Sequence, residues 1–382
     1  MIDPEILSFH LMLLNDRGRM TAYRRAIFET VQPGDVVLDV GTGSGILAIF
    51  ACQAGAKRVY AIDRGEIIVL ARELARANGL ADRITFLKKD VKRLKLEEPV
   101  DVVTSELIAK AVLGQNMAEL IGFCRDRFLK PAGKILPERV ELHIAPVQNE
   151  IGYQQSRPPE RNLYEIRFDP LQQLSINKPI SSRIAAEALL DDGQTAYSYY
   201  AATASNSDTF QTKLTFLPKR KGMLHGFAGW FSAVLAKGIA LTNEPPGTPS
   251  WDNLFFPLSE SVEVEPGMSV EVDLRGRCDS QVQEFWIWNT TVRKADHLIA
   301  SHKQSSFAGR ILSMDAIRKA SEGWRPAPNL NAKIAQLALG LMDQNASLRT
   351  IADRVQKEFP DNFVTVEDAL IEVRKIAEQY GD

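Results

Sequence analysis

The sequence predicts a doubly wound α/β domain, followed by an antiparallel β domain and a small helical module. The chain has 382 residues, more than a single core normally needs. Short apolar runs alternate with amphipathic stretches in its first third, and segments of period two and then of helical spacing follow. Apolar residues make up 45% and charged residues 25%, a globular composition that excludes disordered, collagenous and disulfide-rich classes.

The first domain is predicted from short runs of mostly apolar residues, which are typical of parallel strands buried on both faces. The stretches between the first strands have helical spacing and end at Gly55 and Gly79, which suit helix ends. We place an N-terminal helix and this domain at residues 1–136. The predicted strands are VVLDV (36–40), RVYAID (58–63), ITFLKKD (84–90) and VDVVTSE (100–106).

From Pro137 onward the pattern changes to alternating apolar and polar residues punctuated by Gly and Pro, which predicts antiparallel strands at residues 137–325. Pro326 and Pro328 mark a linker. Residues 326–382 then show helical spacing with N-cap candidates, so they form the predicted helical module. The clearest β segments are VELHIAPV (140–147), HGFAGWF (225–231), SVEVEPGMSVEVDLRG (261–276) and EFWIWNT (284–290).

Charge and cysteine usage limit the classes of partner. A net charge of -2 gives no electrostatic argument for binding nucleic acid or an anionic membrane. The three cysteines are far apart and the histidines lack ligand spacing, so we expect neither a disulfide framework nor a metal site. No signal peptide or long apolar run is apparent, and we expect a soluble, cytoplasmic protein.

A glycine-rich turn carries the first sign of chemistry. The run DVGTGSG (39–45) follows a buried strand and opens a helix, so backbone amides can approach a ligand closely. Asp63 ends the next strand, where a carboxylate can accept hydrogen bonds from ribose hydroxyls. The spacing DxGxGxG and this acid favour S-adenosylmethionine over NAD. The binding candidates in the turn are Asp39, Gly41, Thr42, Gly43 and Gly45.

Two further strand ends add candidates. Asp90 ends the third strand, where it either accepts from the adenine amino group or is a solvated residue beside two lysines. Ser105 and Glu106 end the fourth strand, which places a carboxylate beside the reactive methyl group. Ligands of open α/β sheets bind outside these carboxyl ends, so Glu106 is the predicted catalytic residue.

Two further motifs stand in the sequence: the pattern HxxLLxDxxRxxxY, formed by His10, Leu13, Leu14, Asp16, Arg19 and Tyr23, and the run TPSWDNLFFPL (248–258). With them, residues 10–310 resemble the protein arginine methyltransferases, whose pattern HxxMLxDxxRxxxY has methionine in place of Leu13 and whose THW loop is similar to the run. The resemblance implies that Arg19 binds the cofactor carboxylate and that Trp251, Ser250 and Asn253 adjoin the substrate. It also implies a β-barrel and a head-to-tail homodimer, for which the polar segment 191–208 is a candidate arm.

The departures from the family bear on the substrate. The family grips arginine with two glutamates, whereas this chain has Glu106 and Gln115, and Ser250 replaces the histidine of the loop. A guanidinium offers five donors and is best held by two carboxylates. One carboxylate with one amide also suits a neutral nitrogen of Asn, Gln or His. We therefore favour a non-arginine nitrogen, with arginine as the alternative.

Three helical segments close the chain, LNAKIAQLALGLMD (330–343), SLRTIADRVQKEF (347–359) and VEDALIEVRKIAEQY (366–380). With them, residues 329–382 resemble the PqqD-like domains that bind leader peptides of ribosomally made natural products. That resemblance implies a precursor-peptide substrate whose leader docks on the tail, while a helical appendage remains the alternative reading. The sequence thus predicts a cofactor-dependent N-methyltransferase acting on a side-chain nitrogen of a peptide or protein. The alternatives are an arginine methyltransferase of a cellular protein, a small-molecule methyltransferase and an inactive cofactor-binding scaffold.

Overall fold

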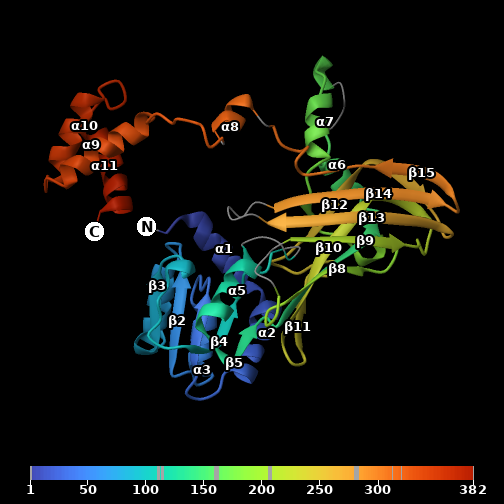
Figure 1. Cartoon of the computed structure of the whole chain (residues 1–382), viewed down its shortest axis with the longest axis horizontal. Helices are drawn as coiled ribbons and strands as arrows, with labels where there is room; N and C mark the ends of the chain where they lie inside the picture. The colour runs from blue at the N-terminus through green and yellow to red at the C-terminus, as the bar shows by residue number, and fades with distance from the viewer. Residues whose placement is uncertain are drawn as a thin grey trace. The chain divides into compact units, whose positions relative to one another are not determined.

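A computed structural model describes residues 2–109, 112, 116–158, 163–204, 209–278, 284–311, 313–319 and 321–381. The chain forms two compact units, Met1–Ile311 and Leu312–Asp382. The predicted α/β and antiparallel domains both belong to the first unit (Figure 1). Helix α2 (Arg17–Thr30) explains this, because it contacts both domains. Its partners are α3 (Ile46–Gln53) and β5 (Leu129–Leu136) in the α/β domain, and β10 (Gly222–Ala236) and β11 (Ile239–Thr242) in the antiparallel domain.

Two capped helices begin the chain. The Asp3 carboxylate accepts from the Glu5 amide at 2.8 Å, and that of Asp16 accepts from the Arg19 amide at 3.1 Å. Such caps satisfy amides that have no partner within the helix. The helices are α1 (Pro4–Asn15) and α2 (Arg17–Thr30).

The α/β prediction is confirmed. A parallel five-stranded sheet has the order β3-β2-β1-β4-β5, and β1 is buried along its whole length. Helix α3 packs against β1 and β2, and α5 packs against β4 and β5. The sequence prediction missed β5. The strands are β1 (Val36–Val40), β2 (Arg58–Asp63), β3 (Ile84–Lys88), β4 (Val100–Ser105) and β5 (Leu129–Leu136), and the helices are α3 (Ile46–Gln53), α4 (Ile68–Ala77) and α5 (Met117–Phe128).

The strand order fixes where a ligand can bind. The chain runs outward from β1 through β2 to β3, returns to the other side of β1, and then adds β4 and β5. Loops leaving β1 and β4 therefore diverge in opposite directions at their carboxyl ends. Such a switch point opens a crevice in a doubly wound sheet.

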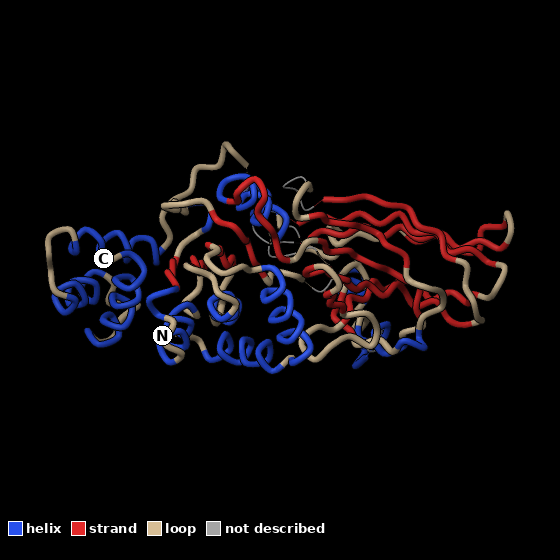
Figure 2. Tube along the Cα trace, turned by 90° about the horizontal axis from the view of Figure 1, so that it is seen from below, coloured by secondary structure: helices blue, strands red, loops and turns tan. Residues whose placement is uncertain are grey.

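The antiparallel prediction is confirmed, but the expected barrel is not. The described strands pair into two sheets, with the order β7-β12-β10-β6-β8 plus β11 on β10, and the order β15-β14-β13-β9 (Figure 2). Alternation in a sequence identifies strands, but it does not say which edges pair. The strands are β6 (Arg139–Val147), β7 (Ile180–Ser182), β8 (Gln194–Tyr200), β9 (Thr209–Phe216), β10 (Gly222–Ala236), β11 (Ile239–Thr242), β12 (Asn253–Val264), β13 (Met268–Cys278), β14 (Glu284–Lys294) and β15 (His297–His302).

Aromatic side chains join the two sheets. The ring of Phe256 on β12 meets Trp286 and Trp288 of β14 edge to face, with centroids 5.1 and 5.7 Å apart. The buried indole nitrogen of Trp288 donates to the Pro257 carbonyl at 2.9 Å. These tryptophans are thus core residues that fix the two sheets against each other.

The candidate dimer arm is placed differently from the prediction. Within 191–208, the residues of β8 pair with β6 as an edge strand, and residues 205–208 lie outside the described part. The segment between β6 and β7 contains two short helices instead, and Figure 1 shows α7 standing away from the sheets. These helices are α6 (Glu150–Gln155) and α7 (Asp169–Ser175).

The second unit confirms the predicted helices. The Ser347 hydroxyl caps α10, and Thr365 forms a capping box with Asp368 at the start of α11. A separate core includes Ile334, Ile351 and Val373. Its described residues, 313–319 and 321–381, contain no strand. The helices are α8 (Met314–Lys319), α9 (Leu330–Met342), α10 (Leu348–Glu358) and α11 (Val366–Tyr380).

Candidate functional site

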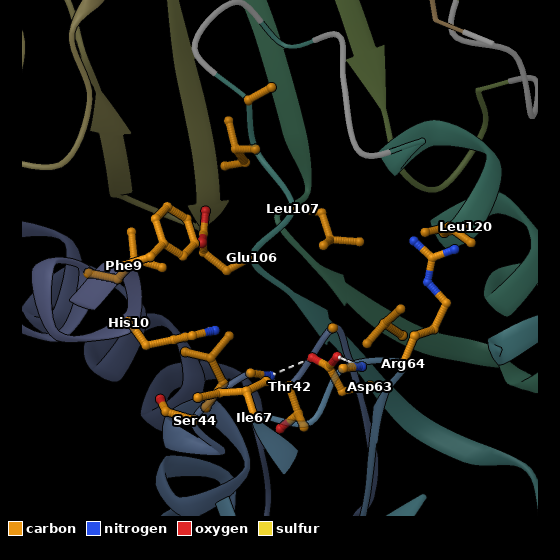
Figure 3. Close-up of a pocket in the computed structure, with 18 of the residues that line it drawn as sticks. Phe9, His10, Thr42, Ser44, Asp63, Arg64, Ile67, Glu106, Leu107 and Leu120 are labelled. Atoms are coloured by element: carbon orange, nitrogen blue, oxygen red, sulfur yellow. Dashed lines mark hydrogen bonds between the residues drawn. The ribbon is translucent and has the colours of Figure 1, made fainter. Parts of the chain in front are cut away.

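A cavity of about 860 Å³ lies at the carboxyl ends of β1, β2 and β4. Phe9 and His10 of α1 line it (Figure 3). Ser250 and Trp251 of the antiparallel domain line it as well. The structure therefore brings together residues that are far apart in the sequence. The predicted site residues that line the cavity are Arg19, Gly41, Thr42, Gly43, Asp63, Asp90, Glu106, Ser250 and Trp251.

The glycine-rich turn forms a close-fitting wall of the cavity. Gly41 and Gly43 have φ values of 70° and 54°, a region that suits glycine. A Cβ at Gly43 would lie 2.6 Å from Cε1 of His10, and one at Gly41 would lie 2.8 Å from Cδ2 of Leu107. A side chain at either position would meet these neighbours, so the turn presents its backbone to the cavity.

Asp63 is oriented by the same turn. Its Oδ2 accepts from the Gly43 amide at 2.9 Å, and its Oδ1 accepts from the Gly65 amide at 2.7 Å (Figure 3). Each carboxylate oxygen can accept more than one hydrogen bond. The fixed carboxylate can therefore still accept from the hydroxyls of a ribose.

Three predicted binding residues support the site from behind instead of lining it. Asp39 is fully buried and accepts from the Thr42 hydroxyl at 2.5 Å, and burial raises the pKa of Asp39 to about 7. The Ser105 hydroxyl donates to the Val40 carbonyl at 2.9 Å, which ties β4 to β1. Gly45 begins α3 with a φ of 80°. Their backbone and buried positions explain why they do not reach the ligand space.

Arg19 and Glu106, which both line the cavity, form an ion pair. The two side chains are only 4% and 13% exposed. Within the described part, Nε and Nη1 of Arg19 and Oε1 of Glu106 are buried without a hydrogen-bond partner. Since buried polar atoms normally have partners, these three atoms indicate a polar ligand that both donates and accepts.

Burial also acts on the charge of Arg19. It lowers the pKa of Arg19 to about 10, although Tyr23 and Asp16 act to raise it. The guanidinium carbon lies 4.7 Å from the centroid of the Trp251 ring. Arg19 remains charged near neutral pH and is held between the ring and Glu106, which suits a ligand carboxylate.

Ser250 has a structural partner that the sequence did not reveal. Its hydroxyl donates to Oδ2 of Asp16 at 2.5 Å, and the Thr248 hydroxyl donates to the same oxygen at 3.2 Å. Burial acts to raise the pKa of Asp16, but these hydrogen bonds, together with those from the Arg19 and Ser250 amides, outweigh it and the pKa lies below its ordinary value. Ser250 thus joins the antiparallel domain to the cap of α2.

The other predictions have mixed outcomes. Asp90 lines the cavity, but its Oδ1 also accepts from the Lys92 amide at 2.8 Å and caps a single helical turn. Asn253 does not line the cavity, because its buried amide donates to the Asn243 carbonyl at 2.5 Å and orders the backbone. Gln115 lies outside the described residues. Glu284 of β14 lines the cavity, and no motif in the sequence indicated it.

The cavity suits S-adenosylmethionine better than a metal. In the described part of the chain, no cluster of His, Cys, Asp and Glu is arranged to hold a metal ion. The glycine cradle and Asp63 suit a nucleoside, and the free polar atoms of Arg19 suit a carboxylate. No described helix combines the length and hydropathy needed to span a bilayer.

Two family models match the first unit. The model described as ribosomal protein L11 methyltransferase (PrmA) matches residues 23–135. The model described as PRMT5 oligomerisation domain matches residues 143–314. They meet near the boundary between the α/β and antiparallel domains, and both end before the helices α9, α10 and α11.

Several curated proteins are similar in sequence. A probable protein arginine N-methyltransferase 6 of Arabidopsis thaliana is 36% identical over 233 residues, 59% of this chain and 54% of that protein. Protein arginine N-methyltransferase 1 of Saccharomyces cerevisiae is 28% identical over 275 residues, 69% of this chain and 79% of that protein. The chain thus spans little more than half the length of the first of these relatives.

Solved structures show the same arrangement of domains. The Trypanosoma brucei PRMT1 enzyme-prozyme complex with AdoHcy gives a TM-score of 0.72 at 24% identity, over 78% of this chain and 96% of that one. The Arabidopsis thaliana protein arginine methyltransferase 10 gives a TM-score of 0.67 at 25% identity, over 78% of this chain and 99% of that one. This chain has the fold of the protein arginine methyltransferases over its first unit, and the similarities and the cavity together support S-adenosylmethionine as its cofactor.

Proposed function

We propose that the protein transfers a methyl group from S-adenosylmethionine to a side-chain nitrogen of a peptide or protein, with arginine as the first candidate. The Arg19–Glu106 pair beside the glycine cradle is the observation that carries this proposal. The relatives named as arginine N-methyltransferases favour arginine over the amide nitrogen that the sequence pattern favoured.

Each residue has a separate task in this reaction. Bound S-adenosylmethionine would supply an electrophilic methyl group. Gly43 and Asp63 hold the nucleoside, and the unpaired nitrogens of Arg19 bind the carboxylate. Oε1 of Glu106 accepts a hydrogen bond from the substrate nitrogen, aligns it, and can take up the proton that it releases. Positioning supplies most of the rate, because methyl transfer needs an in-line approach.

Methylation of an Asn, Gln or His nitrogen is the second candidate. It rests on Gln115, which replaces the second glutamate of the arginine-gripping loop. An amide can donate as well as accept, so it suits a neutral group. An arginine side chain would have one carboxylate fewer to bind in a site that contains glutamine in place of this glutamate.

We also propose a precursor peptide as substrate, on the resemblance of residues 329–382 to leader-binding domains. The compact second unit has a core of its own, which suits an independent docking module. Truncation at residue 312 removes this unit. If peptide methylation falls while methylation of free amino acids is unchanged, the unit binds substrate. Equal activity with and without it favours a structural appendage.

A homodimer is a further part of the proposal. Large apolar side chains are exposed in and before α7, where Tyr164 is 82%, Ile166 54% and Leu171 51% exposed. Contiguous exposed apolar side chains mark interaction sites. The variant Leu171→Asp is expected to lower the sedimentation coefficient if this segment forms the dimer. An unchanged sedimentation coefficient would show that this segment does not form the dimer interface.

The central experiment combines labelled S-adenosylmethionine with peptides containing Arg, Asn, Gln or His, with and without a leader. Tandem mass spectrometry locates any added methyl group. Methylated arginine supports the first candidate, whereas methylated Asn, Gln or His supports the second. Product formed with small molecules alone favours a small-molecule enzyme, and binding without turnover on any substrate indicates an inactive scaffold.

Glu106→Gln provides the matched variant for this experiment. It keeps the size of the side chain and removes its charge, so turnover should fall below detection with little loss of cofactor affinity. Glu271→Gln removes the same charge from an exposed position on β13 and should leave turnover unchanged. Near-normal turnover of Glu106→Gln contradicts the role assigned to this carboxylate.

A further inference from the structure

A second cavity lies between helix α2 and the turn that joins β10 to β11. Its volume is about 520 Å³. Helix α2 lies beside both strands, which places the turn next to the helix (Figure 1). Among the described residues, none lines both this cavity and the one that contains Glu106. The residues that α2 contributes are Arg17, Gly18, Thr21, Ala22 and Arg25.

Helical spacing explains why these side chains share one face. Arg17, Thr21 and Arg25 stand four positions apart, which places them in one row along the helix. Arg19 and Tyr23 belong to the opposite, buried face. Helix α2 therefore lines the cofactor cavity with one side, through Arg19, and the second cavity with the other.

Small residues leave this cavity open between the helix and the turn. Four of its eight lining residues have no side chain beyond a methyl group. Two of them, Gly18 and Ala22, belong to α2, and the other two, Gly238 and Ala240, lie across from them. A Cβ built on Gly238 would have no atom within 4 Å. Larger side chains at these four positions would occupy the cavity.

The charged groups around this cavity are all positive. Arg17 and Arg25 are exposed, and neither forms an ion pair with any described residue. Lys237, which precedes Gly238 in the turn, is exposed as well. No described acid lines the cavity, and the carboxylate of Asp16, at the start of α2, is already occupied by donors. A concave surface of one charge concentrates ions of the opposite sign, so this cavity favours anions.

The spacing of the two arginines limits the kind of anion. A guanidinium offers five donors in a planar fork that matches a carboxylate or a phosphoryl group. Arg17 and Arg25 are two helical turns apart, about 12 Å along the axis, which suits two acidic groups of one chain better than one small ion. A nucleic acid would need a longer basic track, and the net charge of the protein is -2.

The two cavities are close enough for one peptide to occupy both. Arg17 and Arg19 are two positions apart, and they lie on opposite sides of a helix that is about 10–12 Å wide. An extended chain covers about 3.3–3.6 Å per residue. A few residues therefore connect a group at Arg17 with one in the cofactor cavity.

We propose that the second cavity binds acidic side chains of the peptide or protein substrate, outside the residue that is methylated. Arg17 and Arg25 supply the charge, and Thr21 supplies a hydroxyl between them. The bound groups are carboxylates or phosphoryl groups carried by a peptide. This inference rests on the proposed function, because it assumes a peptide or protein as methyl acceptor.

The test is a competition between peptides that differ in one pair of side chains. Each peptide has a central arginine and, at a varied distance from it, two glutamates, two glutamines, two phosphoserines or two serines. The peptides compete for the full-length protein with S-adenosylhomocysteine, and mass spectrometry quantifies those that bind. The acidic peptides should be enriched roughly 3- to 10-fold over their neutral partners at a preferred distance, since exposed ion pairs contribute modestly. The enrichment should shrink in about 0.5 M salt.

Matched variants assign the preference to the cavity. Arg17→Gln/Arg25→Gln should bring the enrichment close to one, and each single variant should lose part of it. Arg24→Gln is the control, because it removes the same charge from an exposed residue of α2 that does not line the cavity. Ala240→Phe keeps both arginines but fills the space, so it should also abolish the enrichment, and it provides the comparison if the double variant does not fold.

Three results overturn the inference. They are equal binding of acidic and neutral peptides to the wild-type protein, an unchanged preference in the folded double variant, and enrichment that does not depend on the distance from the central arginine. An oligonucleotide that displaces the acidic peptides and binds more tightly would also reject a peptide ligand. Failure of the proposed function is distinguishable, because an acidic preference that depends on Arg17 and Arg25 without methyl transfer would reject the activity and retain the site.

Discussion

Removal of the Arg19 guanidinium should affect stability and cofactor binding by separable mechanisms. In Arg19→Met the apolar part of the side chain is largely kept, but Glu106 becomes a carboxylate that is 13% exposed and has lost its ion-pair partner. Breaking a buried ion pair from one side costs about 3–5 kcal/mol. Because Glu106 keeps some contact with solvent, we expect a loss of about 3 kcal/mol in the free energy of unfolding.

The effect on the cofactor has a different origin. The unpaired Nε and Nη1 of Arg19 are the proposed donors to the cofactor carboxylate. A hydrogen bond to a charged group contributes about 1.5–3 kcal/mol. The dissociation constant for S-adenosylhomocysteine should therefore rise by roughly 10- to 150-fold in Arg19→Met. Isothermal titration calorimetry measures this change, and urea denaturation measures the stability.

A double variant separates the two effects. Arg19→Met/Glu106→Gln removes the unpaired charge, so it should recover most of the lost stability while the cofactor affinity stays weak. Arg24→Met is the matched control, because Arg24 is an exposed residue of α2 whose guanidinium carbon lies 4.4 Å from the Phe28 ring centroid. Unchanged affinity in Arg19→Met, or a double variant as unstable as Arg19→Met, refutes the reasoning.

Three further perturbations test other parts of the structure. Gly43→Ala and Gly79→Ala should each lower the free energy of unfolding by about 1–2 kcal/mol in calorimetry, because both glycines have positive φ. Only at Gly43 would the new Cβ approach another side chain, with His10 at 2.6 Å, so only Gly43→Ala should also weaken cofactor binding. Equal affinities would contradict the cradle. The folded pKa of Asp39, about 7, lies above its ordinary value of 3.8, so its ionisation destabilises the fold as pH rises through this interval. In urea denaturation, the wild-type protein should lose on the order of 2–4 kcal/mol of its free energy of unfolding between about pH 4 and 7, and Asp39→Asn should abolish this loss. If the variant and the wild-type protein have the same pH profile, Asp39 is not the source of the loss. Deletion of residues 312–382 should leave the Kd for S-adenosylhomocysteine within about twofold of the wild-type value, since these residues form a separate unit. A larger change would show that the first unit does not bind the cofactor independently of the second.

Local patterns were sufficient for most elements. Val36–Val40 is an uninterrupted apolar run around one acid, and only a strand buried on both faces suits it. Ser347 and Thr365 marked the starts of α10 and α11 because their hydroxyls cap the first turn. The glycine turn was also predictable from a local pattern, since its backbone geometry favours residues without a side chain.

Contacts between distant segments could not be predicted from the sequence. Residues 191–208 are polar enough for an exposed arm, but β6 offers an edge and β8 pairs with it. Alternation predicted the strands of the antiparallel domain, whereas their division into two sheets depends on which edges meet. Neither choice is encoded in the spacing of residues along one strand.

Residue patterns along the chain predicted most of the secondary structure, the glycine cradle and the chemistry of the cofactor. Each of these depends on residues that are neighbours along the chain or that end adjacent strands. Only the tertiary structure placed Ser250 on the cap of α2, Asp39 behind the turn, and Glu284 at the cavity. These placements depend on two domains packing around one crevice, and residues that meet across such an interface have no fixed separation in sequence.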